Sequence, residues 1–247
     1  MRTARLIATA VATLLLSATA VPAHADDAPV DPPAPVCTFS NAKVSPSGVV
    51  LGIKKIKHVK VTATAANCEN EGPAAVEFDG NMDVAGPFEP SATDPTKWSG
   101  TVRLVPKWLY NSDAGKGKGM VVFEDGSTPV SLGANFTLKR ASRLDVGGLP
   151  SKIKKNKKFY YGAFLDVANW EGPWYGAQEG KKVRLQTHTK GHKYKTIKTV
   201  TSFYGQNGGF LPATARLKKT TWFRWVFDGT ATTSAVTAYA GHVTVKK

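Results

Sequence analysis

Alternation of apolar and polar positions is the dominant pattern along this chain. In the segment 58–64, Val59 and Val61 fall on one side and Lys60 on the other, which is the two-residue period of a half-buried β-strand. The same alternation recurs at 222–227, where three aromatic residues share one side. No segment keeps an apolar period of 3.6 residues over three turns. We therefore expect an all-β protein.

The predicted strands fall into two groups, separated by turns rich in Gly, Pro and Asp-Gly pairs. The first group comprises 58–64, 76–78, 98–104, 120–123 and 135–139. The second comprises 144–146, 159–167, 183–187, 194–200, 209–217, 222–227 and 236–245. Seven strands in roughly 105 residues is the count of a constant-type immunoglobulin-like or fibronectin-like sandwich. We predict two tandem antiparallel β-sandwiches, 36–141 and 142–247.

The first residues have the layout of a bacterial-type secretory signal peptide. Arg2 and Arg5 form a positive region, an apolar run follows at 6–20, and Ala23-His24-Ala25 is a small-x-small cleavage site. We expect residues 1–25 to be removed, and no later segment is apolar enough to span a membrane. The proline-rich stretch 26–35 favours an extended tether. The prediction is a secreted protein, held at the cell envelope non-covalently if it stays there.

Cysteine usage agrees with export. The chain has two cysteines, Cys37 and Cys68, and an even count in a secreted chain predicts one disulfide. Two free thiols are the alternative. A zinc site is not expected, because the chain has no CxxC spacing.

Positive charge is concentrated in the second half of the chain. Residues 26–141 carry 12 Lys/Arg and 13 Asp/Glu, a net charge of −1, whereas residues 142–247 carry 19 and 5, a net charge of +14. The second half also holds 16 of the 24 aromatic residues. This composition suits a surface that meets polyanions or sugars, or alternatively a solubilised surface around an aromatic core.

Several motif blocks of the second half occur in the order of a known repeat. These are Gly180–Gln186, Tyr194–Ile197, Val200–Ser202, Gly209-Phe210 and Trp222–Gly229. Over 143–247 the sequence resembles the immunoglobulin-like repeat of secreted actinobacterial proteins. Residues 36–141 resemble other secreted immunoglobulin-like domains only in outline. The resemblance implies an immunoglobulin-like fold and says little about function.

Catalytic motifs are absent from the sequence. None of the four histidines after residue 25 lies near a Gly-x-Ser-x-Gly turn, and no Gly-rich phosphate loop is present. His188 and His192 flank a Lys190-Gly191 turn with no acidic or Cys partner nearby, so we interpret them as turn residues rather than a metal half-site. We predict a non-enzymatic protein without a cofactor.

The oxygen-bearing side chains of Asp79, Asn81 and Asp83 alternate as they do at the start of a calcium loop. The sixth position is Val84 where glycine is required, and the twelfth is Pro90 where glutamate belongs. A hairpin turn at Asp79-Gly80, between strands at 76–78 and 82–84, fits better. These three residues are therefore weak candidates, and no metal is predicted.

Two segments are candidate binding sites. The densest charge run contains Lys152, Lys154, Lys155, Lys157 and Lys158. It is either a solvated loop before a strand or an anion contact, reinforced by Lys182 and Arg184 on one exposed strand face. The aromatic loop contains Trp170, Trp174 and Tyr175. Its rings either stack on sugars or a protein partner, or the tryptophans fold back to cap the core.

Together these patterns favour an extracellular binding or adhesion-type module. Its basic second domain would dock on an anionic cell-wall polymer or polysaccharide, and the first domain would act as a spacer or contact a secreted protein. Nucleic acid is not expected as a physiological partner of a secreted protein. The alternatives are a structural or protein-partner module whose charge serves solubility, and a secreted enzyme or enzyme inhibitor.

Overall fold

The computed structural model describes residues 36–68, 72–79, 84–203 and 209–246. The signal peptide and tether predicted at 1–35, together with Asn81 and Asp83, lie outside these residues. Within them the helical segments are two 3-10 turns, η1 (Pro106–Trp108) and η2 (Asn111–Asp113). No helix of the described residues has the length and apolar character needed to cross a membrane. The all-β prediction is confirmed.

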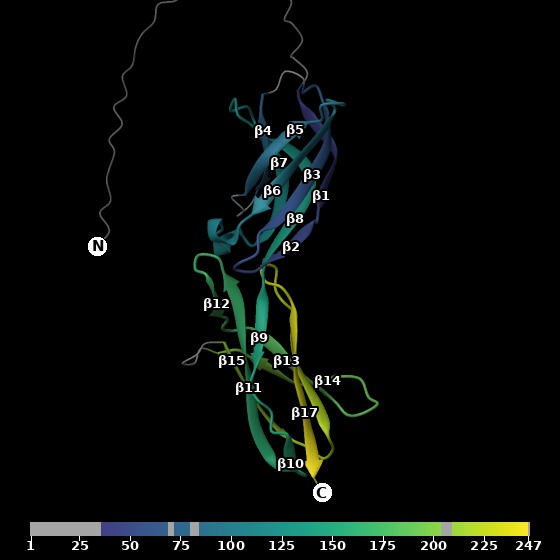
Figure 1. The fold of residues 1–247 in the computed structure, drawn as a ribbon, viewed down its shortest axis with the longest axis vertical. Helices are drawn as coiled ribbons and strands as arrows, with labels where there is room; N and C mark the ends of the chain where they lie inside the picture. Colours follow the sequence, from purple (N-terminus) through teal and green to yellow (C-terminus); the bar gives the residue numbers. More distant parts are fainter. Residues whose placement is uncertain (1–35, 69–71, 80–83, 204–208, 247) are drawn as a thin grey trace, which may run out of the picture. The chain divides into compact units, whose positions relative to one another are not determined.

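The first sandwich is one eight-stranded sheet that folds around its core (Figure 1). Its strand order is β1-β3-β6-β5-β4-β7-β8-β2. The strands are β1 (Thr38–Ser45), β2 (Gly48–Leu51), β3 (Lys57–Ala66), β4 (Ala74–Asp79), β5 (Ala85–Pro90), β6 (Lys97–Leu104), β7 (Gly115–Phe123) and β8 (Val130–Arg140). The strand β5 pairs with β4 on one side and β6 on the other, so it joins the two faces.

The core of the first sandwich follows the alternation seen in the sequence. Alternate positions of both strands are buried, among them Val59 and Val61 of β3 and Val121 and Phe123 of β7. Phe78 stacks on Phe136 with ring centroids 4.6 Å apart. The strands β4 and β5 pair in antiparallel fashion, and Glu77 lies opposite Ala85. Gly80 and Met82, which belong to the predicted hairpin between them, lie outside the described residues.

The second sandwich has two sheets. One contains β9 (Ser142–Val146), β11 (Lys158–Asn169), β12 (Trp174–Ala177) and β15 (Phe210–Arg216). The other has the order β10-β17-β16-β13-β14, formed by β10 (Lys152–Lys154), β17 (Val236–Lys246), β16 (Thr221–Phe227), β13 (Lys182–His188) and β14 (Lys195–Thr201). The first, second and fifth of the seven predicted strands share one sheet and the third, sixth and seventh share the other, which is the immunoglobulin arrangement. The fourth, β14, joins the second of these sheets.

Two strands of the second sandwich differ from the prediction. The charge pattern of 152–158 predicts a solvated loop, but 152–154 form β10, which pairs in parallel with the end of β17. Ile153 is buried in the core between two exposed lysines. The Gly/Pro-rich surroundings of 174–177 predict a loop, yet these residues form β12 on the end of β11.

Trp170 links the second sandwich to the core of the first. It follows β11 in the chain, yet its side chain is 4% exposed and packs in the first sandwich's hydrophobic cluster. Its Nε1 donates to the carbonyl oxygen of Leu51 at 3.3 Å, and its backbone N–H donates to Asn111 Oδ1 at 3.1 Å. The boundary predicted between Ala141 and Ser142 remains a prediction.

Candidate polyanion-binding surface

Four segments of the second sandwich contribute exposed cations to one region. They are the stretch from β10 to the start of β11, the β13–β14 hairpin, the β15–β16 turn and the end of β17. We call this region the basic surface. It comprises Lys152, Lys154, Lys155, Lys157, Lys158, Lys193, Lys195, Arg216, Lys218, Lys219 and Lys246, all of which are exposed.

Strand pairing brings these segments together. Lys154 lies opposite Lys246 in the β10–β17 pair, and Lys158 lies opposite Arg216 in the β11–β15 pair. The turn between β10 and β11 is tied to the β15–β16 turn, because the backbone N–H of Asn156 donates to the carbonyl oxygen of Leu217 at 2.8 Å. Backbone structure therefore holds cations from distant parts of the sequence side by side.

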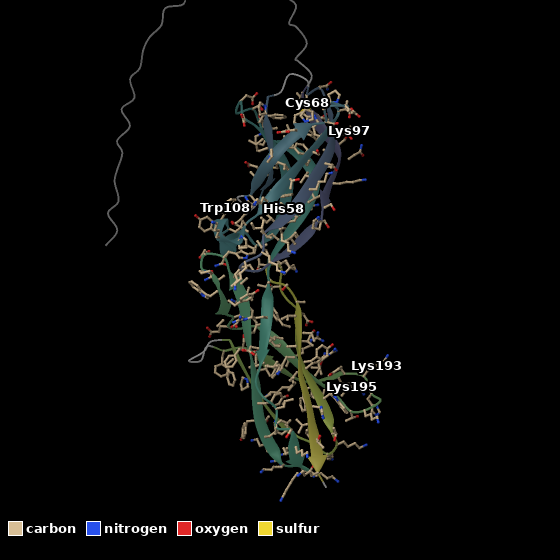
Figure 2. The ribbon with its side chains drawn as sticks, in the orientation of Figure 1. His58, Cys68, Lys97, Trp108, Lys193 and Lys195 are labelled. Atoms are coloured by element: carbon tan, nitrogen blue, oxygen red, sulfur yellow. A yellow bond between two sulfur atoms is a disulfide. The ribbon has the colours of Figure 1, made fainter. Side chains whose placement is uncertain are left out.

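A groove runs beside the hairpin and extends the basic surface. It has a volume of about 700 Å³ and is lined by residues of the β13–β14 hairpin and of the β15–β16 connection, including Lys193, Lys195, Arg216 and Lys219. Figure 2 shows Lys193 and Lys195 on the hairpin. A second hollow of about 360 Å³ lies among Lys152, Lys154, Lys157, Lys158 and Lys246. Cations therefore line both hollows.

Carboxylates are segregated from this surface. The five acidic residues of 142–247 are Asp145, Asp166, Glu171, Glu179 and Asp228, and none lies in the four segments. Two of them are occupied in ion pairs, Asp166 with Arg143 at 2.9 Å and Asp228 with Arg184. Among the described residues, no lysine of the basic surface forms an ion pair with a carboxylate. Their charges are therefore available to an external anion.

The structure does not bring Lys182 and Arg184 to the predicted lysine cluster. Arg184 lies opposite Val226, which lies opposite Thr237 in β17. Lys152 lies opposite Thr244, which is seven residues beyond Thr237 on β17. The two sites are therefore separated by roughly 23 Å along this strand. Arg184 is also paired with Asp228. These two residues form a separate, partly neutralised site.

A stack of rings on the outward side of the five-stranded sheet borders the groove. His188, Trp222 and His242 lie directly opposite one another on β13, β16 and β17. Trp222 stacks on both histidines, with centroid distances of 5.0 and 5.4 Å and interplanar angles of 25° and 29°. The rings thus stand side by side across three strands. His192 lies in the hairpin, where its backbone N–H closes a turn on Thr189.

The next row of the same sheet is centred on Arg224. Its Cζ lies 4.0 Å from the ring centroid of Tyr194 and 5.9 Å from that of Tyr239. Its Nε donates to Gln186 Oε1 at 2.8 Å. Burial raises the pKa of Tyr194, an effect that the charge of Arg224 opposes. Arginine over a tyrosine ring is a favourable cation–π contact.

The three residues of the predicted aromatic loop take different positions. Trp170 is buried in the first sandwich's core. Trp174 is 56% exposed on β12. Tyr175 is half-buried, and the guanidinium of Arg143 lies 4.6 Å from its ring centroid. The loop therefore presents one free aromatic face, that of Trp174.

The weak metal candidates gain no support. Asp79 ends β4, and the other two residues are outside the described part of the chain. Among the residues that the structure describes, no group of three or more His, Cys, Asp or Glu side chains could hold a metal ion. The predicted disulfide is present and joins Cys37 to Cys68.

Sequence reasoning missed most cations outside the run 152–158. Arg216, Lys218, Lys219 and Lys246 come next to the run only through strand pairing. The net charge of +14 indicated that this half contains further cations, but it did not indicate where in the structure they lie. Trp108 and Tyr110 were also missed. Trp108, labelled in Figure 2, ends η1 and is 61% exposed, and Tyr110 directly precedes η2 and is 62% exposed. The guanidinium of Arg103 lies 5.4 Å from the centroid of the Trp108 ring.

Comparisons with known proteins found similarity in structure alone. No family model matches the chain, and no curated protein matches it significantly. An I-band fragment of titin, I67–I69, is similar with 11% identity over 85% of this chain and 65% of that one, at a TM-score of 0.38. The adhesin InvE from Yersinia pseudotuberculosis has 11% identity over 85% and 59%, at 0.33. A superoxide reductase from Ignicoccus hospitalis has 13% identity over 44% and 82%, at 0.31.

Proposed function

We propose that this protein is a secreted, non-enzymatic binding module whose second sandwich docks on an anionic polymer or polysaccharide of the cell envelope. The observation that carries the proposal is the convergence of eleven exposed cations from four segments, none of which contains an Asp or Glu side chain. The signal-peptide pattern and the Cys37–Cys68 disulfide support the extracellular setting. The absence of catalytic motifs from the sequence supports a binding role.

Many separated lysines suit a repeating polyanion. A lysine is a compact point charge on a flexible stem, so it tolerates many positions of an anionic group. Several such contacts release counterions together and make binding steeply dependent on salt. The groove of about 700 Å³ is the natural path for a chain between the hairpin and the β15–β16 turn.

The test is a five-residue variant in which Lys152, Lys154, Lys155, Lys157 and Lys158 become glutamine. Binding of the full chain to washed cell envelopes and to polygalacturonate should weaken. The slope of log affinity against log salt should fall by roughly one for each lysine that pairs with an anionic group of the polymer. Isothermal titration over a salt series measures both quantities.

A matched control is available in the first sandwich. Lys43, Lys54, Lys55, Lys57 and Lys60 are five exposed lysines there. Their replacement by glutamine changes the net charge equally but should leave the salt slope almost unchanged. If the two variants weaken binding to the same extent, net charge alone is responsible and the proposed docking surface is wrong.

A second candidate function is contact with a protein through the first sandwich. It is favoured by Trp108 and Tyr110, two exposed aromatic residues held by consecutive 3-10 turns. Exposed aromatics on a rigid backbone are frequent anchors of protein interfaces. This role predicts a secreted protein that co-purifies in high salt and is lost in Trp108→Ala, with Trp174→Ala as the control.

A further inference from the structure

Arg224 is held in a fixed orientation by its neighbours. Its guanidinium lies over the ring of Tyr194 at 4.0 Å, and its Nε–H is bonded to Gln186. Gln186 is itself only 7% exposed, and its Nε2 donates to Thr196 Oγ1 at 3.1 Å. A chain of three side chains therefore sets the plane of the guanidinium group before any ligand arrives.

The two terminal nitrogens of Arg224 remain open to an external group. In the part of the chain that the structure describes, no side chain or carbonyl accepts a hydrogen bond from them. Arg143 and Arg184 differ, because each of them is paired with a carboxylate, Asp166 or Asp228. A guanidinium fork matches the two oxygens of a planar oxyanion with two parallel hydrogen bonds, whereas an ammonium group makes a point contact.

Arg224 lies on the outward face of the five-stranded sheet, and the end of β17 in the same sheet belongs to the basic surface. It is opposite Tyr239 in β17, and Lys246 is seven residues further along that strand, roughly 23 Å away. The His188–Trp222–His242 row lies between them. An extended polymer held by Lys152, Lys154 and Lys246 on this face would reach Arg224.

The groups around Arg224 suit a sugar ring. Tyr239 is 65% exposed, so its apolar ring face is available for packing, and the hydroxyl groups of both tyrosines can exchange hydrogen bonds with sugar hydroxyls. A flexible phosphate chain has no apolar ring to pack on Tyr239. The combination of one oriented guanidinium and one exposed aromatic ring favours a sugar that carries a carboxylate.

We propose that Arg224, with Tyr239 beside it, recognises the carboxylate of a uronate-type sugar in an acidic polysaccharide. The proposal deepens the proposed function, on which it rests for the polymer, by naming the sugar class. The lysines of the basic surface supply attraction to any polyanion, and Arg224 supplies selection for a planar carboxylate on a pyranose ring.

The test uses two short anions, trigalacturonate and tripolyphosphate, with the full chain. Arg224→Lys keeps the charge and removes the fork, and Arg224→Gln removes both. Arg184→Lys is the matched control, because Arg184 is on the same face and is already paired. Affinities are measured by titration, and the side-chain Nε–H resonance of Arg224 reports direct contact. Circular dichroism checks that each variant is folded.

We expect both Arg224 variants to lose about tenfold or more in affinity for trigalacturonate, because each removes charge-assisted hydrogen bonds. Their affinity for tripolyphosphate should change much less, and Arg184→Lys should bind both like the parent protein. The proposal is overturned if Arg224→Lys binds trigalacturonate normally, if both anions weaken equally, or if trigalacturonate leaves the Arg224 resonance unmoved at millimolar concentration.

Failure of the proposed function would look different. In that case the five-lysine variant would bind polygalacturonate as the parent does, while trigalacturonate would still shift the Arg224 resonance. Conversely, steep loss of polymer binding in the five-lysine variant, together with normal trigalacturonate binding by Arg224→Lys, would retain the docking surface and remove the uronate site.

Discussion

Tyr161 shows how one buried hydroxyl affects the stability of the second sandwich. The residue is 7% exposed, and its ring packs against Phe223 at 5.3 Å and Phe159 at 5.6 Å. Its hydroxyl oxygen has no hydrogen-bond partner among the described residues. Burial raises the pKa of this hydroxyl well above its ordinary value of 10.0.

This shift predicts a loss of stability at alkaline pH. The folded pKa is raised, so the contribution of Tyr161 is complete below about pH 10 and declines as pH rises further, since only the unfolded chain releases the proton. The decline approaches about 1.4 kcal/mol per pH unit. Tyr161→Phe should flatten the dependence of unfolding free energy on pH between about 9 and 11, measured by urea titration, without a loss at neutral pH.

The control for this prediction is the neighbouring Tyr160→Phe. Tyr160 is 72% exposed, so removal of its hydroxyl should leave the alkaline decline unchanged. An identical decline in Tyr161→Phe and the parent protein would mean that other groups determine alkaline stability.

The three residues of the aromatic loop show why single residues were harder to place than strands. Trp170 and Trp174 lie in the same Gly/Pro-rich stretch, and their sequence surroundings do not separate a buried ring from an exposed one. What separates them is tertiary: Trp170 reaches the carbonyl of Leu51, 119 residues earlier in the chain. Local alternation of apolar and polar residues carries no information about a contact between residues so far apart in the chain.

At the scale of elements, long strands with regular alternation could be predicted and short or irregular ones could not. The strands β3, β13 and β16 alternate over seven or more residues and lie close to their predicted positions. In contrast, β10 has three residues and one apolar side chain, and its partner strand lies about 90 residues further along the chain. The strand β5 contains Gly86 and Pro87, which individually disfavour a strand.

Gly100 in β6 explains how β5 is accommodated. A Cβ at this position would lie 2.1 Å from the carbonyl oxygen of Pro87, so only glycine permits the close approach of the two strands. The sequence shows Gly100 but not the strand that presses against it. The packing requirement becomes visible only when both strands are placed.

The disulfide fixes the pairing of β1 with β3. Cys37 precedes β1 and Cys68 follows β3, beside the first cross-strand pair, Thr38 with Ala66. The bond spans 31 residues. Its restriction of the unfolded chain lowers the conformational entropy of that state, which stabilises the folded protein by roughly 3 to 4 kcal/mol. The double variant Cys37→Ser/Cys68→Ser should lose a comparable unfolding free energy in urea titration.

Reductant provides the control for the disulfide prediction. It should reproduce the loss in the parent protein and have no effect on the double variant. Polyanion binding should persist in both cases, because the basic surface belongs to the other sandwich. A double variant as stable as the parent would show that β1 is held by packing alone.

At the scale of the whole molecule, the charge asymmetry was evident in the sequence and its spatial pattern was not. The count of +14 in residues 142–247 predicts a basic second sandwich. It could not show that the lysines of 152–158 join those near Arg216 and Lys193 while Lys182 and Arg184 lie apart. Counting charges gives a total, whereas strand register decides which charges are neighbours.

Trp170 makes a prediction at the same scale, because it joins the two sandwiches. Trp170→Ala removes a buried ring from the first sandwich's core and should cost about 3 to 5 kcal/mol. The parent should unfold in a single transition, and the variant should show a separate, earlier transition of the first sandwich. Urea titration followed by near-ultraviolet circular dichroism measures both.

The exposed Trp174 is the comparison for this experiment. Trp174→Ala should change the unfolding free energy by less than about 0.5 kcal/mol. Similar small losses in both variants, with a single transition retained, would show that Trp170 does not couple the sandwiches.

The strand β14 forms one edge of the five-stranded sheet, and all but one of its residues are exposed, including Ile197 at 52%. Unpaired edges of this kind are templates for association between molecules, and lysines on them act as a deterrent. Lys195 and Lys198 are exposed on this edge, where their charges would oppose such association, and Lys195 also belongs to the basic surface. A polyanion that neutralises these lysines removes their repulsion. Excess polymer should therefore promote association of the protein through the edges of β14. Light scattering would detect this association as an increase in particle size.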